Sequence, residues 1–451
     1  MQASEVDPWL RAGGIVVTAS DRAARALQSE FRRARQAEGL KAWPAPSILD
    51  WRSFVRTSWT ERALDHRLLL NPTQELALWA EIAGREPQPA TLLDGPRHRV
   101  AALAMEAHDL LASHAPGYLR PGARRAWHQD AASFSEWLSA FDELCNNNNL
   151  VGAGRLPLDL IPPLQNSASS PRPSLLIAGF DRILPAQRSV FDAWGALREL
   201  PHGEPASEID YYRAADVQTE LAACALWCKH RLAVNPRARL LVVTQEAASR
   251  RGEIERIFLR HIGSSASPLF EFSLGIPLSK VPMAKSAHLL LRWLGHSLEE
   301  SEVDWLFSSG HIAANPQELA ALEHVMRELR RRSQQRTHWT LDAFCRSEQS
   351  VRMLSPSWIQ RVQQAQRLLA QRADRPQSPF EWAGLVPQLL KTAGWPGFRA
   401  LASTEFQAAQ RWQQAVETCG SLGFDGRRAS WQEFLSQLAR TLDETLFAPE
   451  S

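Results

Sequence analysis

Three short apolar runs constrain the fold more than any other feature of this sequence. They are Ile15–Thr18, Leu175–Ala178 and Leu240–Thr244, and each has the length of a single strand. The last two are continuous, which is typical of strands buried on both faces of a parallel sheet. Helical patterns follow them along the chain, at Asp21–Arg35, Ala186–Leu197 and Ala247–Arg260. The sequence therefore predicts an α/β fold, and the predicted strands fall near residues 15, 175 and 240.

Long helical stretches separate or follow these strands. Apolar residues recur at helical spacing from Leu68 to Leu144 and from Lys285 to Leu442, and the second stretch is interrupted at Gly394–Gly397. Asp216–Arg231 is a further predicted helix, and the polar tract Asn146–Asn149 is interpreted as a loop. Neither long stretch fits a single crossover between neighbouring strands, so both are interpreted as helical domains inserted into an α/β fold.

Composition limits the setting and the partners. The 451 residues carry a formal net charge of +2, so no strong basic field indicates nucleic acid. Five scattered cysteines suggest reduced thiols and a cytoplasmic location. No apolar run is long enough for a transmembrane helix, so no membrane partner is expected.

The scarcity of lysine excludes two phosphate chemistries. A P-loop requires a Gly-Lys pair, and a restriction-type nuclease core requires an acidic residue two positions before a lysine. Neither pattern occurs at the five lysines, which are Lys41, Lys229, Lys280, Lys285 and Lys391. The sequence therefore predicts neither ATP hydrolysis nor DNA cleavage by this chain.

Other catalytic and metal patterns are also weak. The strand Leu175–Ala178 does not end in the Asp-Glu pair of a nucleoside triphosphatase, and Asp181, beyond its turn, is interpreted as a cap. Cys224 and Cys228 are one helical turn apart on an apolar stretch and are interpreted as core residues, not zinc ligands. We therefore expect no metal site and no cofactor.

One arginine-rich segment is the first candidate for contact with DNA. Two interpretations stay open, a solvated charged face and a surface that contacts backbone phosphates. The 17 tryptophans leave a similar choice between core packing and stacking on single-stranded bases. The candidate residues are Arg327, Arg330, Arg331, Arg332 and Arg336.

Three motifs together resemble one family. The first is the degenerate helicase motif Val16–Arg25, with Thr18, Arg22 and Arg25. The second is Gly179-Phe180-Asp181, followed by Pro185 and Gln187. The third is the block Gly394-Trp395-Pro396-Gly397, with Gln407 and Trp412. The chain resembles the AddB-like probable DNA repair proteins, which are inactivated superfamily I helicase modules fused to a C-terminal PD-(D/E)XK nuclease. Each motif is weak alone, and the combination carries the resemblance.

The resemblance implies two degenerate RecA-like domains with large helical insertions. The first RecA-like domain is expected at residues 1–50 and 173–205, with its insertion at 51–172. The second is expected at 206–284 and 435–451, with its insertion at 285–434, and it is expected to be incomplete because the family continues further into this domain and a nuclease. On that expectation the chain is a fragment of an exonuclease, and Leu240–Thr244 belongs to a stunted sheet with an open edge.

The expected function is therefore that of a catalytically inactive module in DNA repair and recombination. It would position single-stranded DNA or duplex ends during double-strand-break processing, together with a partner helicase-nuclease subunit. The alternative is a helical scaffold for protein–protein interaction that has no DNA contact of its own.

Overall fold

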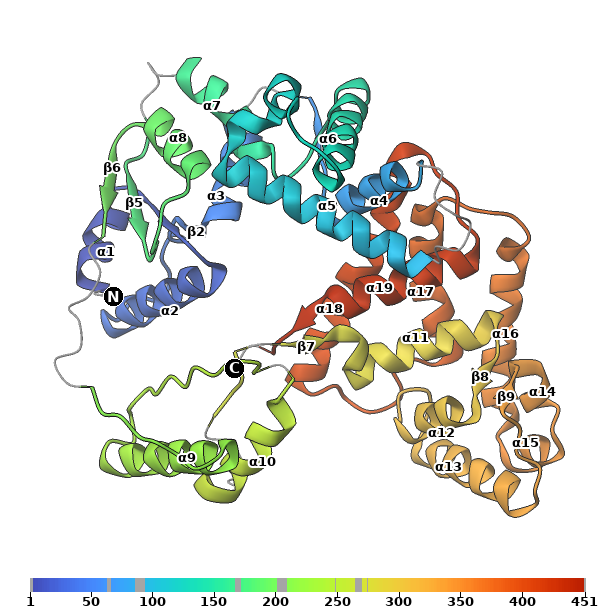
Figure 1. Ribbon diagram of the computed structural model, residues 1–451. Coiled ribbons are helices and arrows are strands. Elements are labelled where there is room, and N and C mark those ends of the chain that lie inside the picture. The colour runs from blue at the N-terminus through green and yellow to red at the C-terminus, as the bar shows by residue number, and fades with distance from the viewer. Residues whose placement is uncertain are drawn as a thin grey trace. The chain divides into compact units, whose positions relative to one another are not determined.

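The computed structural model describes residues 3–62, 66–85, 94–166, 172–200, 209–247, 249–263, 270–273 and 275–449. The chain divides into two compact units, Met1–Glu208 and Ile209–Ser451, and each is described by itself (Figure 1). Both are rich in helix, and the first contains a small parallel sheet. The general expectation of a mostly helical α/β chain is therefore confirmed. None of the described helices is long and apolar enough to cross a membrane.

The first unit is built on a four-stranded parallel sheet in the order β2-β1-β5-β6. The predicted strands β1 and β5 pair in register, with Ile15 opposite Leu175 and Thr18 opposite Ala178. The outer strands β2 and β6 are only three residues long. The sheet strands are β1 (Ile15–Thr18), β2 (Ile48–Asp50), β5 (Leu175–Ala178) and β6 (Leu197–Glu199).

Helices cover both faces of this sheet because its strands are apolar on both sides. Val16 and Leu176 face one way and pack with α1 (Ala3–Arg11) and α2 (Asp21–Ala37). Val17 and Ile177 face the other way, where they pack with α3 (Trp51–Arg62), α7 (Leu156–Asn166) and α8 (Pro185–Trp194). The result is a three-layer arrangement in which α3 and α7 belong to the sheet's own core.

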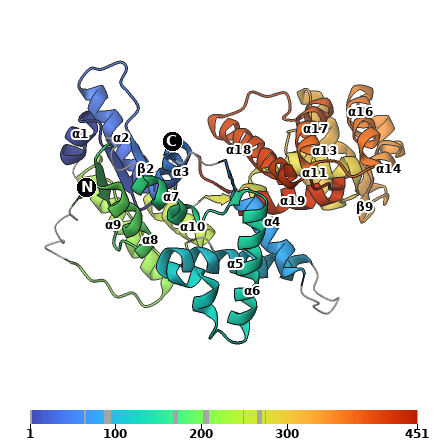
Figure 2. The same ribbon diagram turned by 90° about the horizontal axis from the view of Figure 1, so that it is seen from above.

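Helices α4, α5 and α6 come between α3 and α7 in the chain, and they form a group of their own (Figure 2). Helix α4 packs against α5 and α6, and the short parallel pair β3–β4 joins the beginning of the group to its end. The elements are β3 (Leu68–Leu69), α4 (Pro72–Ala83), α5 (Asp94–His114), two 3₁₀ turns (Pro116–Leu119 and Pro121–Arg124), α6 (Asp130–Asn147) and β4 (Leu150–Val151).

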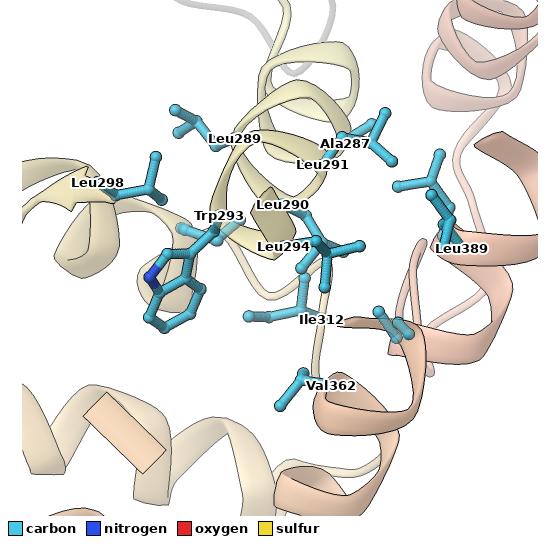
Figure 3. Close-up of a cluster of buried hydrophobic side chains, with 14 of the residues drawn as sticks. Ala287, Leu289, Leu290, Leu291, Trp293, Leu294, Leu298, Ile312, Val362 and Leu389 are labelled. Carbon is cyan, nitrogen blue, oxygen red and sulfur yellow. The ribbon is translucent and has the colours of Figure 1, made fainter. Parts of the chain in front are cut away.

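The second unit contains a large helical core. Leu290, Trp293 and Leu294 of α11 are buried against Ile312 and Val362 (Figure 3). The elements around it are β7 (Ile276–Pro277), the 3₁₀ turn Leu278–Lys280, α11 (Pro282–Gly295), β8 (Leu298–Glu299), α12 (Glu300–Ser308), α13 (Pro316–Arg331), β9 (His338–Trp339), α14 (Leu341–Cys345), α15 (Glu348–Met353), α16 (Pro356–Ala373), α17 (Pro379–Ala393), α18 (Ser403–Gly420), the 3₁₀ turn Ser421–Asp425, α19 (Trp431–Glu444) and β10 (Leu446–Phe447).

Before this core, α9 (Val217–Val234) packs against α10 (Arg251–Ile262) in a small cluster of its own. Cys228 is buried there and Cys224 packs beside it, so the interpretation of this pair as core residues is confirmed. Burial raises the pKa of the Cys228 thiol to about 11.

The prediction of a buried strand at Leu240–Thr244 is wrong. These residues belong to no strand among the described elements, and the side chains of Leu241 and Val243 are 70% and 84% exposed. An apolar run favours extended backbone, but a strand is held only by hydrogen bonds to a neighbouring strand. This segment has no such neighbour in the part of the chain that the structure describes.

Two smaller predictions also need correction. The helix predicted at Ala186–Leu197 ends at Trp194, and Leu197 begins strand β6. The loop predicted at Asn146–Asn149 begins later, since Asn146 and Asn147 form the last turn of α6.

Candidate functional site at the switch point of the sheet

The carboxyl ends of β1 and β5 lie side by side at the point where the strand order reverses. From β1 the chain passes to β2 on one side, and from β5 it passes to β6 on the other. In open α/β sheets the crevice at such a switch point is where ligands bind. Two of the three sequence motifs follow these two strands directly, so the fold brings Thr18 and Gly179 to the same edge.

The polar groups of the first motif are used to hold the turn. The Thr18 side chain is fully buried, and its hydroxyl donates a 2.9 Å hydrogen bond to the Ser20 carbonyl. The Ser20 hydroxyl oxygen accepts a bond from the Ala23 N–H at 3.3 Å and caps α2. Arg25 pairs with Asp21 at 2.7 Å, whereas Arg22 is exposed at the start of the same helix. Neither hydroxyl is therefore presented to a ligand as the P-loop hydroxyl is.

The second motif shapes the turn from β5 into α8. Gly179 has a φ of +71°, and the buried Phe180 ring packs edge-on against Phe191 at 6.0 Å. Pro185 opens α8, and Gln187 Oε1 accepts a 2.9 Å bond from the Leu184 N–H. Gln187 thus supplies the side-chain cap at the start of α8. Asp181 is exposed in the loop before the helix.

This edge offers arginine as its exposed cation. Arg22 lies in the first turn of α2, and Arg182 follows Asp181 in the loop after β5; both are exposed. Guanidinium groups bind phosphate oxygens well. Activation of a nucleoside triphosphate needs more, namely a lysine on the terminal phosphates and a hydroxyl or carboxylate on magnesium. The exposed arginines Arg22 and Arg182 are therefore positioned at this edge for contact with phosphate.

The third motif lies in the other unit, where it forms a tight structural junction. Trp395 Nε1 donates a 3.1 Å bond to the Ser286 hydroxyl of α11, and Trp412 of α18 is buried at 2% exposure. Gly394 ends α17 in the left-handed conformation, and a Cβ on Gly397 would lie 2.7 Å from the Gly310 carbonyl oxygen.

The two remaining residues of this block have local roles. Pro396 follows Trp395 through a cis peptide bond, and the side-chain amide of Gln407 donates to the Ser403 hydroxyl at 3.4 Å. The block therefore holds α11, α17 and α18 together.

Most of the arginine-rich segment is held by carboxylates. Arg330 bridges Glu300 at 2.8 Å and Asp304 at 2.9 Å, while Arg331 and Arg332 share Glu328. Hydrogen bonds from Arg331 and Arg332 lower the pKa of Glu328 to about 2.

The ends of the segment have other contacts. Arg327 donates to the Glu323 carbonyl, and the Arg336 guanidinium lies 4.9 Å from the centre of the Trp339 ring. Local pairing of this kind favours the interpretation as a solvated face over that as a phosphate-binding surface.

Sequence reasoning missed one cluster of ionisable groups in the helical part of the first unit. Glu75 and His108 are buried on α4 and α5, and Asp109 follows His108. Beside them is a cavity of about 430 Å³, whose lining includes Phe141 and Gly152. The available signal was a carboxylate and an imidazole within apolar helix faces, where polar groups are rare.

Comparisons with known proteins add no identification. No family model matches this chain. No curated protein matches it either.

Proposed function

We propose that this chain is a non-catalytic helicase-like module that holds DNA within a DNA repair and recombination protein. The observation that carries the proposal is the meeting of two degenerate motifs at the switch point, with Thr18 at the end of β1 and Gly179 directly after β5. This is the ligand-binding position of nucleotide-binding sheets. In this chain the local hydroxyl and amide groups cap or close turns instead.

The proposed DNA contact is the exposed arginine pair Arg22 and Arg182 at this edge. The segment Arg327–Arg336 is not part of this proposed contact, because its central arginines already have carboxylate partners. Binding through guanidinium and phosphate groups is independent of base sequence and weakens as salt rises. A partner motor or nuclease would perform the chemistry, and this chain would position the strand.

Two measurements test the proposal. The first is steady-state phosphate release with and without DNA, for which we expect no activity above background. The second is the affinity for labelled single-stranded and blunt duplex oligonucleotides across a salt series. We expect Arg22→Ala with Arg182→Ala to weaken binding several-fold, and to flatten the single-strand salt slope by about 0.7 for each lost phosphate contact.

The matched control is Arg330→Ala with Arg331→Ala, which removes two arginines that are held by carboxylates. It should leave affinity and slope near those of the wild-type protein. Equal losses in both double variants would show only a general charge effect and would contradict the assignment to the switch point. DNA-stimulated ATP hydrolysis that copurifies with the protein would contradict the non-catalytic role.

The second candidate, a scaffold for protein–protein interaction, is favoured by one observation. Large apolar side chains are exposed on the segment that contains α9, and they include Tyr211, Tyr212, Val234, Leu241 and Val243. Apolar surface gathered in this way usually marks an interaction site. Wild-type protein that shows no salt-dependent affinity for any DNA form would favour this candidate over the first.

A further inference from the structure

The cluster of Glu75, His108 and Asp109 joins two helices in the interior of the first unit. Glu75 comes from α4 and the other two residues from α5, and one ligand-type atom of each lies within 4.8 Å of the others. Glu75 is 1% exposed and His108 is fully buried. These are nitrogen and oxygen donors of the kinds that bind divalent transition metals.

Several buried polar atoms of this cluster have no hydrogen-bond partner among the residues that the structure describes. They are both ring nitrogens of His108, Oε1 of Glu75 and Oδ1 of Asp109. Oε2 of Glu75, by contrast, accepts a 2.9 Å bond from the Ala153 N–H. A buried polar atom without a partner is costly, so unsatisfied atoms on three clustered side chains indicate a ligand.

An ion pair between Glu75 and His108 does not account for the arrangement. Their closest atoms, Oε1 and Nδ1, are 3.6 Å apart, which is longer than a hydrogen bond. Such a pair would also leave the Asp109 oxygen without a partner.

The chain beside the cluster has glycines at two positions where a side chain would clash with the cluster's carboxylates. A Cβ on Gly152 would lie 2.9 Å from Glu75 Oε1, and a Cβ on Gly154 would lie 2.6 Å from Asp109 Oδ1. Side chains are therefore excluded from both positions. Gly152 also lines the neighbouring cavity of about 430 Å³.

Aromatic rings enclose the other sides. Trp79 stacks on Phe141 with their centres 4.3 Å apart, and the His108 ring lies 5.6 Å from Trp79 and 5.5 Å from Phe141. An apolar surrounding of this kind strengthens the attraction between carboxylates and a cation. It also restricts the imidazole to a narrow range of orientations.

We propose that Glu75, His108 and Asp109 bind one divalent transition metal ion of the Zn²⁺ or Mn²⁺ class. One imidazole nitrogen and two carboxylate oxygens would coordinate it, and water would complete the shell. The ion ties α4 to α5, and so acts as a clamp within the helical part of this unit. This site is independent of the proposed contact with DNA.

The test begins with wild-type protein that has been treated with a chelator and dialysed. Titration with Zn²⁺ and with Mn²⁺ is followed by calorimetry, and bound metal is counted by elemental analysis after gel filtration. We expect one ion for each chain and a higher thermal midpoint in the metal-loaded protein. Failure of both ions to bind at equimolar ratio, or binding with no thermal shift, would overturn the clamp.

Near-isosteric variants assign any bound ion to this cluster. Glu75→Gln and Asp109→Asn keep side-chain volume, and His114→Gln on the exposed end of α5 is the matched control. The two cluster variants should lose the bound ion and the thermal shift, whereas the control should keep both. Circular dichroism establishes that each variant is folded, and Co²⁺ absorption of the wild-type protein gives independent evidence for a nitrogen–oxygen ligand set. Equal metal binding by the control and the cluster variants, or a thiolate-type Co²⁺ spectrum, would place the metal elsewhere and refute the proposal.

Discussion

Arg361 and Glu318 form a buried ion pair that joins α16 to the start of α13. The Arg361 Nη2 and Glu318 Oε2 atoms are 2.8 Å apart, and the Glu318 side chain is only 4% exposed. The same carboxylate accepts bonds from the Ala314 N–H and the Ser355 hydroxyl, both at 2.8 Å. The Arg361 guanidinium also lies against Gly394, so the pair supports the junction formed by the third sequence motif.

Removal of one partner should therefore be costly. We expect Glu318→Ala to lower the free energy of unfolding by about 3 kcal/mol, because it leaves the Arg361 guanidinium, only 25% exposed, without its counter-charge. The control is Arg346→Ala, which breaks an exposed pair with Asp342 at 3.6 Å and should cost less than about 1 kcal/mol. Urea unfolding followed by tryptophan fluorescence measures both, and equal losses would contradict a special role for Glu318.

The same pair predicts a dependence on acid. Burial raises the pKa of Glu318, but bonds from Arg361, the Ala314 N–H and Ser355 outweigh it and lower this pKa to about 2. The pKa of Glu318 is lower in the folded protein than its unfolded value of about 4.3. The ionised carboxylate therefore stabilises the fold at pH values above about 4.3, and this stabilisation is lost as the pH falls towards the folded pKa. The stability difference between wild type and Glu318→Gln should therefore narrow from pH 5 to pH 2.5, roughly the range between these two values. A constant difference over that range would contradict the lowered pKa.

Gly397 is expected to tolerate no side chain. Its φ is +96°, and a Cβ would lie 2.7 Å from the Gly310 carbonyl oxygen. Gly397→Ala should therefore cost about 2 to 4 kcal/mol, from backbone strain together with the clash. Gly384 offers a matched control, since it lies exposed within α17 with nothing near its Cβ position, and Gly384→Ala should stabilise by up to about 1 kcal/mol. Thermal unfolding of the two variants should shift in opposite directions.

Gln187 allows the structural role of the second motif to be measured. Gln187→Ala removes the acceptor for the Leu184 N–H and should destabilise the protein by about 1 kcal/mol. Gln187→Glu keeps an acceptor at the same position in the first turn of α8 and should be close to wild type. Neither variant should alter the affinity for DNA, because the side chain acts within the turn. A loss of DNA affinity in Gln187→Ala at unchanged stability would show that this residue contacts the ligand.

The central strands could be predicted and the edge strands could not, for a physical reason. Strands β1 and β5 are continuous apolar runs, whereas β2 and β6 have three residues each and are partly polar. The run at Leu240–Thr244 resembles β5 in sequence yet joins no described sheet, because apolarity favours extended backbone without providing a partner strand. The cluster of Glu75, His108 and Asp109 could not be predicted either, since the approach of Glu75 to His108 depends on how α4 packs against α5.

The exposed run at Leu240–Thr244 leads to the last prediction. Leu241 and Val243 point into solvent at 70% and 84% exposure, in a segment without a described partner strand. Unpaired backbone combined with apolar side chains is a surface on which other chains assemble. We expect the wild-type protein to self-associate with rising concentration, and Leu241→Asp with Val243→Asp to reduce this association by placing charge on that surface. Sedimentation velocity over a concentration series measures the effect.

Val351→Asp is the control, since Val351 is 64% exposed on α15 and should not contribute. Wild-type protein that stays monomeric at high concentration would show that this segment is not an assembly surface. The same conclusion would follow if Val351→Asp reduced the association as much as the double variant does.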